Sequence, residues 1–259
     1  MNSMSKSRIR FFLLLILLAS FGCRKSAEQE RVVTVAVAAN MQFAMKAILE
    51  SYSEENHVEF DLILGSSGKL SAQISQGAPY DIFISADTKY PQEMYKKGVT
   101  EGEPRVYAEG KLVLWTLTDS IEPLLAALDS EHVHHIALAN PKTAPYGKAA
   151  LEILKQQPFY SRIEEKLVFG ESIGQTNQFI TSKSAEIGIT SIGVVRSPEM
   201  KNIGRWVALE NETYPSLLQS AVLLKKEKGV SEEAKDFYAF LFSDKAQQIL
   251  KEYGYSIPN

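Results

Sequence analysis

Residues suited to binding an anion occur at five predicted turns, each placed between a strand and a helix. These turns contain Asn40, Ser67, Ala86, Tyr146 and Ile173. They offer hydroxyls, a side-chain amide and exposed backbone N–H groups as hydrogen-bond donors, and no arginine or histidine lies in them. At a helix start, free N–H groups and the helix dipole favour negative charge. Together the turns predict a neutral cage of donors suited to a dehydrated oxyanion.

A cage made only of donors selects an anion that carries no proton. Molybdate, tungstate and sulfate are fully deprotonated near neutral pH, whereas phosphate keeps a proton that needs an acceptor. Asn40 and Ser67 also have a simpler interpretation, in which each side chain caps the helix that follows it. Each residue taken singly favours capping, so the prediction of an anion site depends on the recurrence of such turns.

The segment from Gly77 to Asp87, GAPYDIFISAD, is the most informative stretch of the chain. Its glycine and proline end a helical pattern, and its Ile-Phe-Ile run is typical of a strand covered on both faces. Small residues, Ser85 and Ala86, follow that run. In open α/β sheets, ligands bind at the carboxyl ends of the strands. This segment therefore predicts a place where a ligand approaches the backbone.

Constellations that could catalyse a reaction are weak in this chain. The histidines are His57, His132, His134 and His135, and the last three crowd one polar loop. No cysteine accompanies that loop, and no carboxylate pair with ligand spacing is evident, so a solvated loop is preferred to a metal site. The sequence contains neither G-x-S-x-G nor H-E-x-x-H.

The segment from Gly65 to Leu70, GSSGKL, is not a phosphate-binding P-loop, because position 63 is isoleucine and Lys69 precedes a leucine. A secreted serine hydrolase that uses Ser67, Lys69 and a histidine is the alternative from another class, although no histidine lies in the five turns. A surface lipoprotein with a vestigial pocket is a third interpretation. We predict a binding protein and not an enzyme.

Apolar runs and amphipathic stretches alternate along the chain and predict an α/β fold built from parallel strand–helix–strand units. The predicted strands cover residues 32–39, 60–64, 82–85, 112–115, 136–139, 167–169, 187–190 and 221–224. Helical spacing follows several of them and fills the last forty residues, where Ser243 is the predicted N-cap of the final helix.

The first 22 residues have the composition of a secretion signal, with basic residues followed by an apolar core too short to span a bilayer. Cys23, the single cysteine, follows Gly22 and is the predicted lipid-modified first residue of the exported protein. Residues 23–31 are charged and aperiodic, as expected for a tether. The predicted location is therefore the periplasmic or other extracytoplasmic face of a membrane, with the lipid on Cys23 as anchor.

Charge and cysteine content limit the function further. The whole chain has a net charge of −3, and removal of residues 1–22 leaves 25 basic and 31 acidic residues, a net charge near −6. This balance argues against a nucleic-acid partner. With a single cysteine, the folded body from Val32 onward can form no internal disulfide.

Seven segments of the chain, in order, resemble the periplasmic molybdate-binding proteins of bacterial molybdate ABC transporters, which are extracytoplasmic solute-binding proteins. The segments are VAVAANMQFAM, LGSSGKLSAQI, GAPYDIFISAD, NPKTAPYGKAALE, GESIGQTNQFI, AEIGITSIG and FSDKAQQILKEYGY. The third is the most specific. The resemblance extends over nearly all of residues 32–259.

The resemblance implies a periplasmic-binding-protein-like fold of type II, with two α/β lobes joined by two chain crossings. Residues 32–108 and 219–259 would form the first lobe and residues 109–218 the second. It also implies binding of molybdate, with tungstate expected as well, for delivery to an ABC permease and its ATPase. A receptor for sulfate or another tetrahedral oxyanion is the alternative. No cofactor is expected, molybdenum would enter only as bound molybdate, and the acidic surface favours a monomer.

Carried over to this chain, the resemblance implies ligand contacts from Asn40, Ser67 and the backbone of Ala86 in the first lobe. The second lobe would contribute Tyr146 and the backbone amide of Ile173. Ser66 and Ser191 are further candidates. The chain departs from the family pattern in two places: some members have a serine where this chain has Asn40, and many have a tyrosine where it has Ser191. In contrast, other members have a small residue where this chain has Tyr146.

Overall fold

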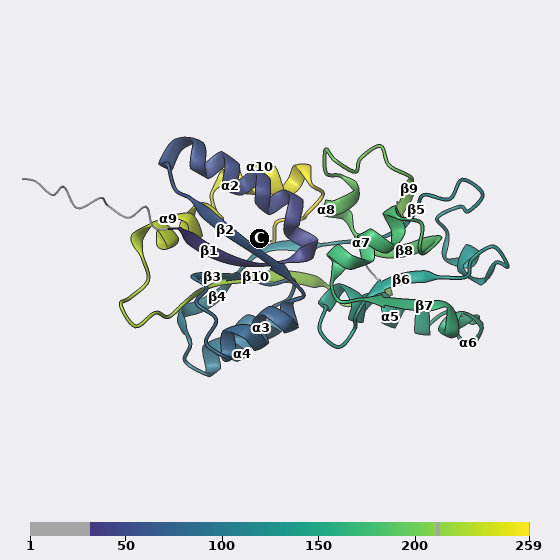
Figure 1. The fold of residues 1–259 in the computed structure, drawn as a ribbon, viewed down its shortest axis with the longest axis horizontal. Helices are drawn as coiled ribbons and strands as arrows, with labels where there is room; N and C mark the ends of the chain where they lie inside the picture. The colour runs from purple at the N-terminus through teal and green to yellow at the C-terminus, as the bar shows by residue number, and fades with distance from the viewer. Residues whose placement is uncertain (1–31, 211–212, 259) are drawn as a thin grey trace, which may run out of the picture. The chain divides into compact units, whose positions relative to one another are not determined.

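Two mixed sheets of five strands each organise the residues that the computed structural model describes, 32–210 and 213–258 (Figure 1). The predicted signal segment, Cys23 and the tether lie outside the described residues. The first sheet has the order β2-β1-β3-β10-β4 and the second has the order β7-β6-β8-β5-β9. This arrangement confirms the predicted two-lobed fold of type II.

Strands of the first sheet combine a parallel core with two antiparallel strands. They are β1 (Val33–Ala38), β2 (Phe60–Gly65), β3 (Ile82–Ile84), β4 (Thr100–Gly110) and β10 (Leu217–Leu224). β1 pairs in parallel with β2 and β3, whereas β10 pairs antiparallel with both β3 and β4. The predicted parallel units are confirmed for the first three strands, and the antiparallel strands were not predicted.

The second sheet repeats this mixture. Its strands are β5 (Leu112–Thr116), β6 (Ile136–Ala139), β7 (Leu167–Gly170), β8 (Ile187–Ser191) and β9 (Arg205–Ala208). β6 pairs in parallel with β7 and β8, and β5 pairs antiparallel with β8 and β9. The chain enters this sheet between β4 and β5, at Lys111, and returns to the first sheet between β9 and β10. The exact lobe boundaries, 108/109 and 218/219, stay a prediction.

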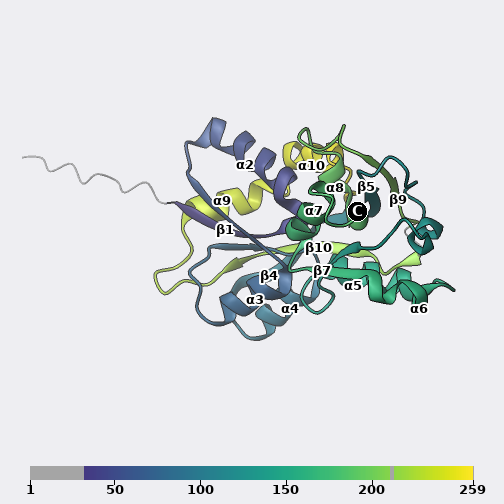
Figure 2. The ribbon, with the colours of Figure 1, turned by 45° about the vertical axis from the view of Figure 1, so that its right-hand side comes forward.

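Helices cover both faces of the first sheet. α2 (Gln42–Asn56) and α10 (Asp244–Glu252) pack together on one side, and α3 (Ser67–Ser75) and α4 (Lys89–Lys96) pack together on the other (Figures 1 and 2). Within β3, Ile82 and Ile84 face one apolar cluster and Phe83 faces another. The strand is therefore buried on both sides, as its continuous apolar run predicts.

The remaining helices are shorter on average. They are α5 (Pro145–Lys155), α6 (Tyr160–Ile163), α7 (Ile173–Thr181), α8 (Ile192–Val195) and α9 (Glu232–Phe240), with 3-10 turns η1 (Ala39–Met41), η2 (Leu125–Asp129) and η3 (Glu164–Lys166). The Ser243 hydroxyl accepts from the amide of Ala246, which confirms the predicted N-cap of α10. Over residues 32–210 and 213–258, no helix is both long and apolar enough to cross a bilayer.

Candidate functional site

A cavity lies where predicted strand-to-helix turns of both lobes meet. It has about 190 Å³ of empty volume, part of it open to solvent. It is lined by Ala38, Ala39, Asn40, Gly65, Ser66, Ser67, Ala86, Ala144, Pro145, Tyr146 and Ile173. All five residues predicted as ligands are in this set, together with the further candidate Ser66. None of these lining residues carries a formal charge. Whether they contact a ligand stays a prediction.

Three lining side chains of the first lobe follow the ends of β1 and β2. Asn40 lies in η1, directly after β1, and Ser66 and Ser67 lie at the start of α3, directly after β2. Neither helix start has a side-chain cap. The simpler interpretation of Asn40 and Ser67 as caps is therefore not what the structure shows, and their polar groups point to other partners.

The two serines differ in how their hydroxyls are used. The Ser67 Oγ accepts a hydrogen bond from the backbone amide of Ala86 at 3.0 Å. That amide, predicted to contact the ligand, is thus already engaged. The Ser66 Oγ is buried and has no hydrogen-bond partner. Because an unpaired buried hydroxyl is costly, this atom is well suited to form a hydrogen bond with a ligand in the cavity.

The second lobe presents two helix starts to the cavity. Helix α5 begins with Pro145, a residue suited to the first helical position, and Tyr146 follows it. Helix α7 begins at Ile173 after Ser172, whose side chain makes no cap. The first amides of a helix have no intrahelical acceptor, so the N–H of Ile173 is available to an anion.

Gln219, which the sequence analysis missed, lies directly behind the cavity. Its Oε1 accepts from the Asn40 Nδ2 at 2.8 Å, and its Nε2 donates to the Tyr146 hydroxyl at 3.3 Å. The residue is completely buried in β10. A glutamine beside Ser220 in an otherwise apolar run was the available signal, but the predicted strand began only at residue 221.

Burial keeps the Tyr146 hydroxyl neutral. Its pKa is raised well above the ordinary value, first by burial and then by the neighbouring Tyr255, Tyr107 and Tyr214, against a smaller opposite effect of the Asn40 side chain. The hydroxyl therefore keeps its proton through the physiological pH range and remains a hydrogen-bond donor.

Ser191 lies beside the cavity and is not among its lining residues. Its hydroxyl donates to the carbonyl oxygen of Asn40 at 3.3 Å, and the Tyr255 hydroxyl donates to the same oxygen at 2.8 Å. Burial raises the pKa of Tyr255 to about 12, so this donor also keeps its proton. Both residues hold the Asn40 turn in place from its backbone side.

Two contacts join the lobes at the rim of the cavity. The amide of Gly68 donates to the carbonyl oxygen of Thr143 at 2.9 Å. Next to it, the Lys69 ammonium forms an ion pair with the Glu171 carboxylate. A Cβ on Gly68 would lie 2.9 Å from the Thr143 carbonyl oxygen, so glycine permits this close approach. The structure is thus a form in which the lobes touch.

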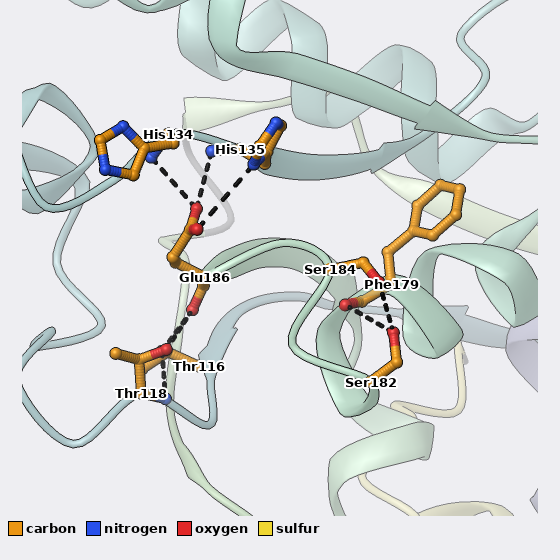
Figure 3. A network of polar contacts seen from close by, with 8 residues as sticks. All are labelled: Thr116, Thr118, His134, His135, Phe179, Ser182, Ser184 and Glu186. Atoms are coloured by element: carbon orange, nitrogen blue, oxygen red, sulfur yellow. Dashed lines mark hydrogen bonds and ion pairs between the residues drawn. The ribbon is translucent and has the colours of Figure 1, made fainter.

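The histidine loop is a structural junction (Figure 3). The backbone amides of His134 and His135 donate to the Glu186 carboxylate at 3.1 and 2.7 Å, while the Thr116 hydroxyl donates to the Glu186 carbonyl oxygen. The side chains of both histidines are exposed, as predicted for a solvated loop. In the described part of the chain, no group of three or more histidine, cysteine, aspartate or glutamate residues is arranged to hold a metal ion.

Comparison with known proteins supports the resemblance seen in the sequence. The family described as bacterial extracellular solute-binding proteins matches residues 33–256. The molybdate-binding protein ModA of Azotobacter vinelandii is 33% identical over 94% of this chain and 97% of that protein. ModA of Rhodobacter capsulatus is 35% identical over 86% of this chain and 87% of that protein.

A solved structure matches over a similar range. The periplasmic molybdate-binding protein of Azotobacter vinelandii superposes with a TM-score of 0.80 at 28% identity, covering 88% of this chain and all of that one. The two-lobed fold and the alignment over nearly the whole length therefore agree with each other.

Proposed function

We propose that this chain, which belongs to the bacterial extracellular solute-binding proteins, binds molybdate and delivers it to an ABC transporter. The observation that carries the proposal is the chemistry of the cavity. Its polar lining groups are hydroxyls, one carboxamide and helix-start amides, with no charged side chain among them. Such a lining favours a dianion without protons.

The unpaired Ser66 hydroxyl supports the same conclusion. A buried hydroxyl without a partner costs roughly 1–3 kcal/mol, which a bound oxyanion would recover as a charge-assisted hydrogen bond. Ser66 follows Gly65 and lines the same cavity as Tyr146. We therefore propose Asn40, Ser66, Ser67, Tyr146 and the Ile173 amide as the ligand contacts.

Closure of the lobes would follow from the way these contacts are shared. Asn40 and the two serines follow strands of the first sheet, whereas Tyr146 and Ile173 follow strands of the second. An anion held by all of them is bound fully only when the lobes touch. Ligand binding would then shift the population toward the closed form, which the transporter recognises.

Binding, and not catalysis, is the proposed mode of action. The hydrolase alternative requires a free base near Ser67. Lys69 instead pairs with Glu171, and the Ser67 oxygen accepts from Ala86. These engagements leave Ser67 without the activated environment of a nucleophile.

Finer features of the function rest on the sequence. We propose that tungstate binds as well, since it is a dianion of similar shape and protonation. We also propose export, lipid anchoring through Cys23, a monomeric receptor, and a permease with its ATPase as partners. The predicted signal segment and single cysteine support the anchor.

Calorimetric titration tests the proposal. The chain without residues 1–23 is titrated with molybdate, tungstate, sulfate and phosphate at one pH. We expect tight binding of molybdate and tungstate and none of phosphate. Equal binding of sulfate would reassign the receptor to sulfate. If none of the four anions bound, the proposal of an oxyanion receptor would be refuted. Ser67→Ala separates the classes, because a receptor loses affinity whereas an enzyme loses turnover.

A further inference from the structure

Gln219 connects the two sides of the cavity from behind. Its Oε1 accepts from the Asn40 Nδ2 at 2.8 Å and from the Tyr107 hydroxyl at 3.2 Å. Its Nε2 donates to the Tyr146 hydroxyl at 3.3 Å. Asn40 follows a strand of the first sheet and Tyr146 follows a strand of the second. One buried carboxamide is thus bonded to lining residues of both lobes.

The direction of these hydrogen bonds decides what the cavity offers. A phenol has one proton to donate and lone pairs that accept. Because the Gln219 Nε2 fills an acceptor site on the Tyr146 oxygen, the Tyr146 proton is left for a different acceptor, and Tyr146 is one of the residues that line the cavity. In the reversed amide orientation, Oε1 would accept the Tyr146 proton and the cavity would lose that donor.

Two donors hold the amide in the observed orientation. The Asn40 Nδ2 and the Tyr107 hydroxyl both point to Oε1, and a reversed amide would place an N–H group against the Asn40 donor. Tyr107 is itself buried, and burial raises its pKa well above the ordinary value, so its hydroxyl keeps its proton. That proton has two acceptors within reach, the Gln219 Oε1 at 3.2 Å and the Ser85 carbonyl oxygen at 3.4 Å.

Strand β4 leaves space for this arrangement. A Cβ at Gly110 would lie 1.8 Å from the Tyr146 hydroxyl oxygen and 2.7 Å from the Gln219 Nε2. The absence of a side chain at Gly110 therefore permits the contact between Tyr146 and Gln219, next to the crossing into the second lobe.

We propose that Gln219 is a positioning residue that fixes the Tyr146 hydroxyl as a donor to the bound oxyanion. The proposal rests on the proposed function and adds a residue that does not line the cavity. Its role would be to make the lining donor-only, which is the property that favours an anion without protons.

A double-mutant cycle on affinity tests this role. Gln219→Met, Tyr146→Phe and the double variant are made in the full-length chain, purified in detergent and titrated with molybdate, with the thermal midpoint of each measured without ligand. We expect each single variant to bind about tenfold more weakly, the equivalent of one lost hydrogen bond. The loss in the double variant should be clearly smaller than the sum of the two single losses, because Gln219 would act largely through that hydroxyl, although it also holds Asn40.

A second pair of variants tests the proposal with smaller changes, which are less able to unfold the protein. Tyr107→Phe keeps the ring and removes one donor to Oε1, so affinity should fall about threefold. Tyr238→Phe is the matched control: its hydroxyl donates to the carbonyl oxygen of Ala221, also on β10, and it is not a lining residue. Its affinity should equal that of the wild type.

The outcomes separate the two proposals. If the wild type binds molybdate and Gln219→Met binds equally well, or if the losses of the two single variants add, the role of Gln219 is refuted and the receptor stands. Equal losses in Tyr107→Phe and Tyr238→Phe would also refute it. If the wild type binds none of molybdate, tungstate and sulfate, both proposals fall.

Discussion

Replacing Ser66 by alanine should separate ligand affinity from stability. The structure contains, among its described residues, two buried side-chain oxygens without a partner, those of Ser66 and Ser197. Ser66 lines the cavity and Ser197 does not. The second serine is therefore a matched control, since both variants remove the same kind of unpaired hydroxyl.

The expected changes in stability and affinity follow from the free-energy cost of an unpaired buried hydroxyl. Ser197→Ala should raise the free energy of unfolding by about 1 kcal/mol, which shifts the thermal midpoint by roughly 2–4 °C in a domain of this size. Ser66→Ala should raise it by a similar amount, because the Ser66 oxygen is likewise buried and without a partner. A hydrogen bond to a charged group contributes about 1.5–3 kcal/mol, so Ser66→Ala should weaken molybdate binding about 10-fold to 150-fold.

Calorimetry measures the molybdate affinity of the two variants, and thermal denaturation measures their stability. We expect Ser66→Ala to lose affinity without losing stability, and Ser197→Ala to bind as the wild type does. If Ser66→Ala bound molybdate normally, the unpaired hydroxyl would have no part in recognition. If both variants lost affinity equally, the effect could not be assigned to the cavity.

Three further predictions concern the frame of the site. Gly110→Ala should destabilise the fold by roughly 1–3 kcal/mol and weaken molybdate binding, since its Cβ would overlap Tyr146; denaturant titration and calorimetry measure both, and unchanged affinity would contradict the crowding argument. Glu171→Ala should weaken binding by at most about fivefold at low salt and not at high salt, because its ion pair with Lys69 is exposed; a loss independent of salt would exclude a screened pair. Burial raises the pKa of Glu186, but the backbone amides that donate to its carboxylate have the larger combined effect, and the pKa is lowered overall. The stabilisation by this carboxylate is therefore complete above pH 4.5 and is lost as the pH falls through the lowered pKa. The thermal midpoints of wild type and Glu186→Ala should converge in acid, and a constant difference between them would refute this.

The sequence predicted the elements that local patterns specify. Strand β3 was found because its apolar run is continuous, and β6 was predicted with its exact bounds, Ile136–Ala139. Strand β4 was missed because most of its first seven residues are exposed and leave no apolar alternation. The antiparallel pairing of β10 with β3 and β4 depends on segments far apart in the chain, and local periodicity contains no information about it.

The sequence predicted residues that line the cavity, but not the residue that supports them from behind. Asn40, Ser67, Tyr146 and Ile173 each follow a strand end, so the fold class alone brings them together. Gln219 is different, since its contact with Asn40 spans 179 residues. Its role becomes clear only when the donor and the acceptor of each of its hydrogen bonds are known. The distinction between Ser66 and Ser67 likewise required the partner of each hydroxyl.

The hydrogen bond from Tyr255 to the carbonyl oxygen of Asn40 joins residues 215 positions apart. Contacts of such sequence separation form late in folding, because the intervening chain must first be closed into a loop. The Asn40 turn therefore reaches its final geometry only after nearly the whole chain is present. A chain still emerging from a translocation channel would hold no anion, and capture would begin only when its last segment has folded against its first.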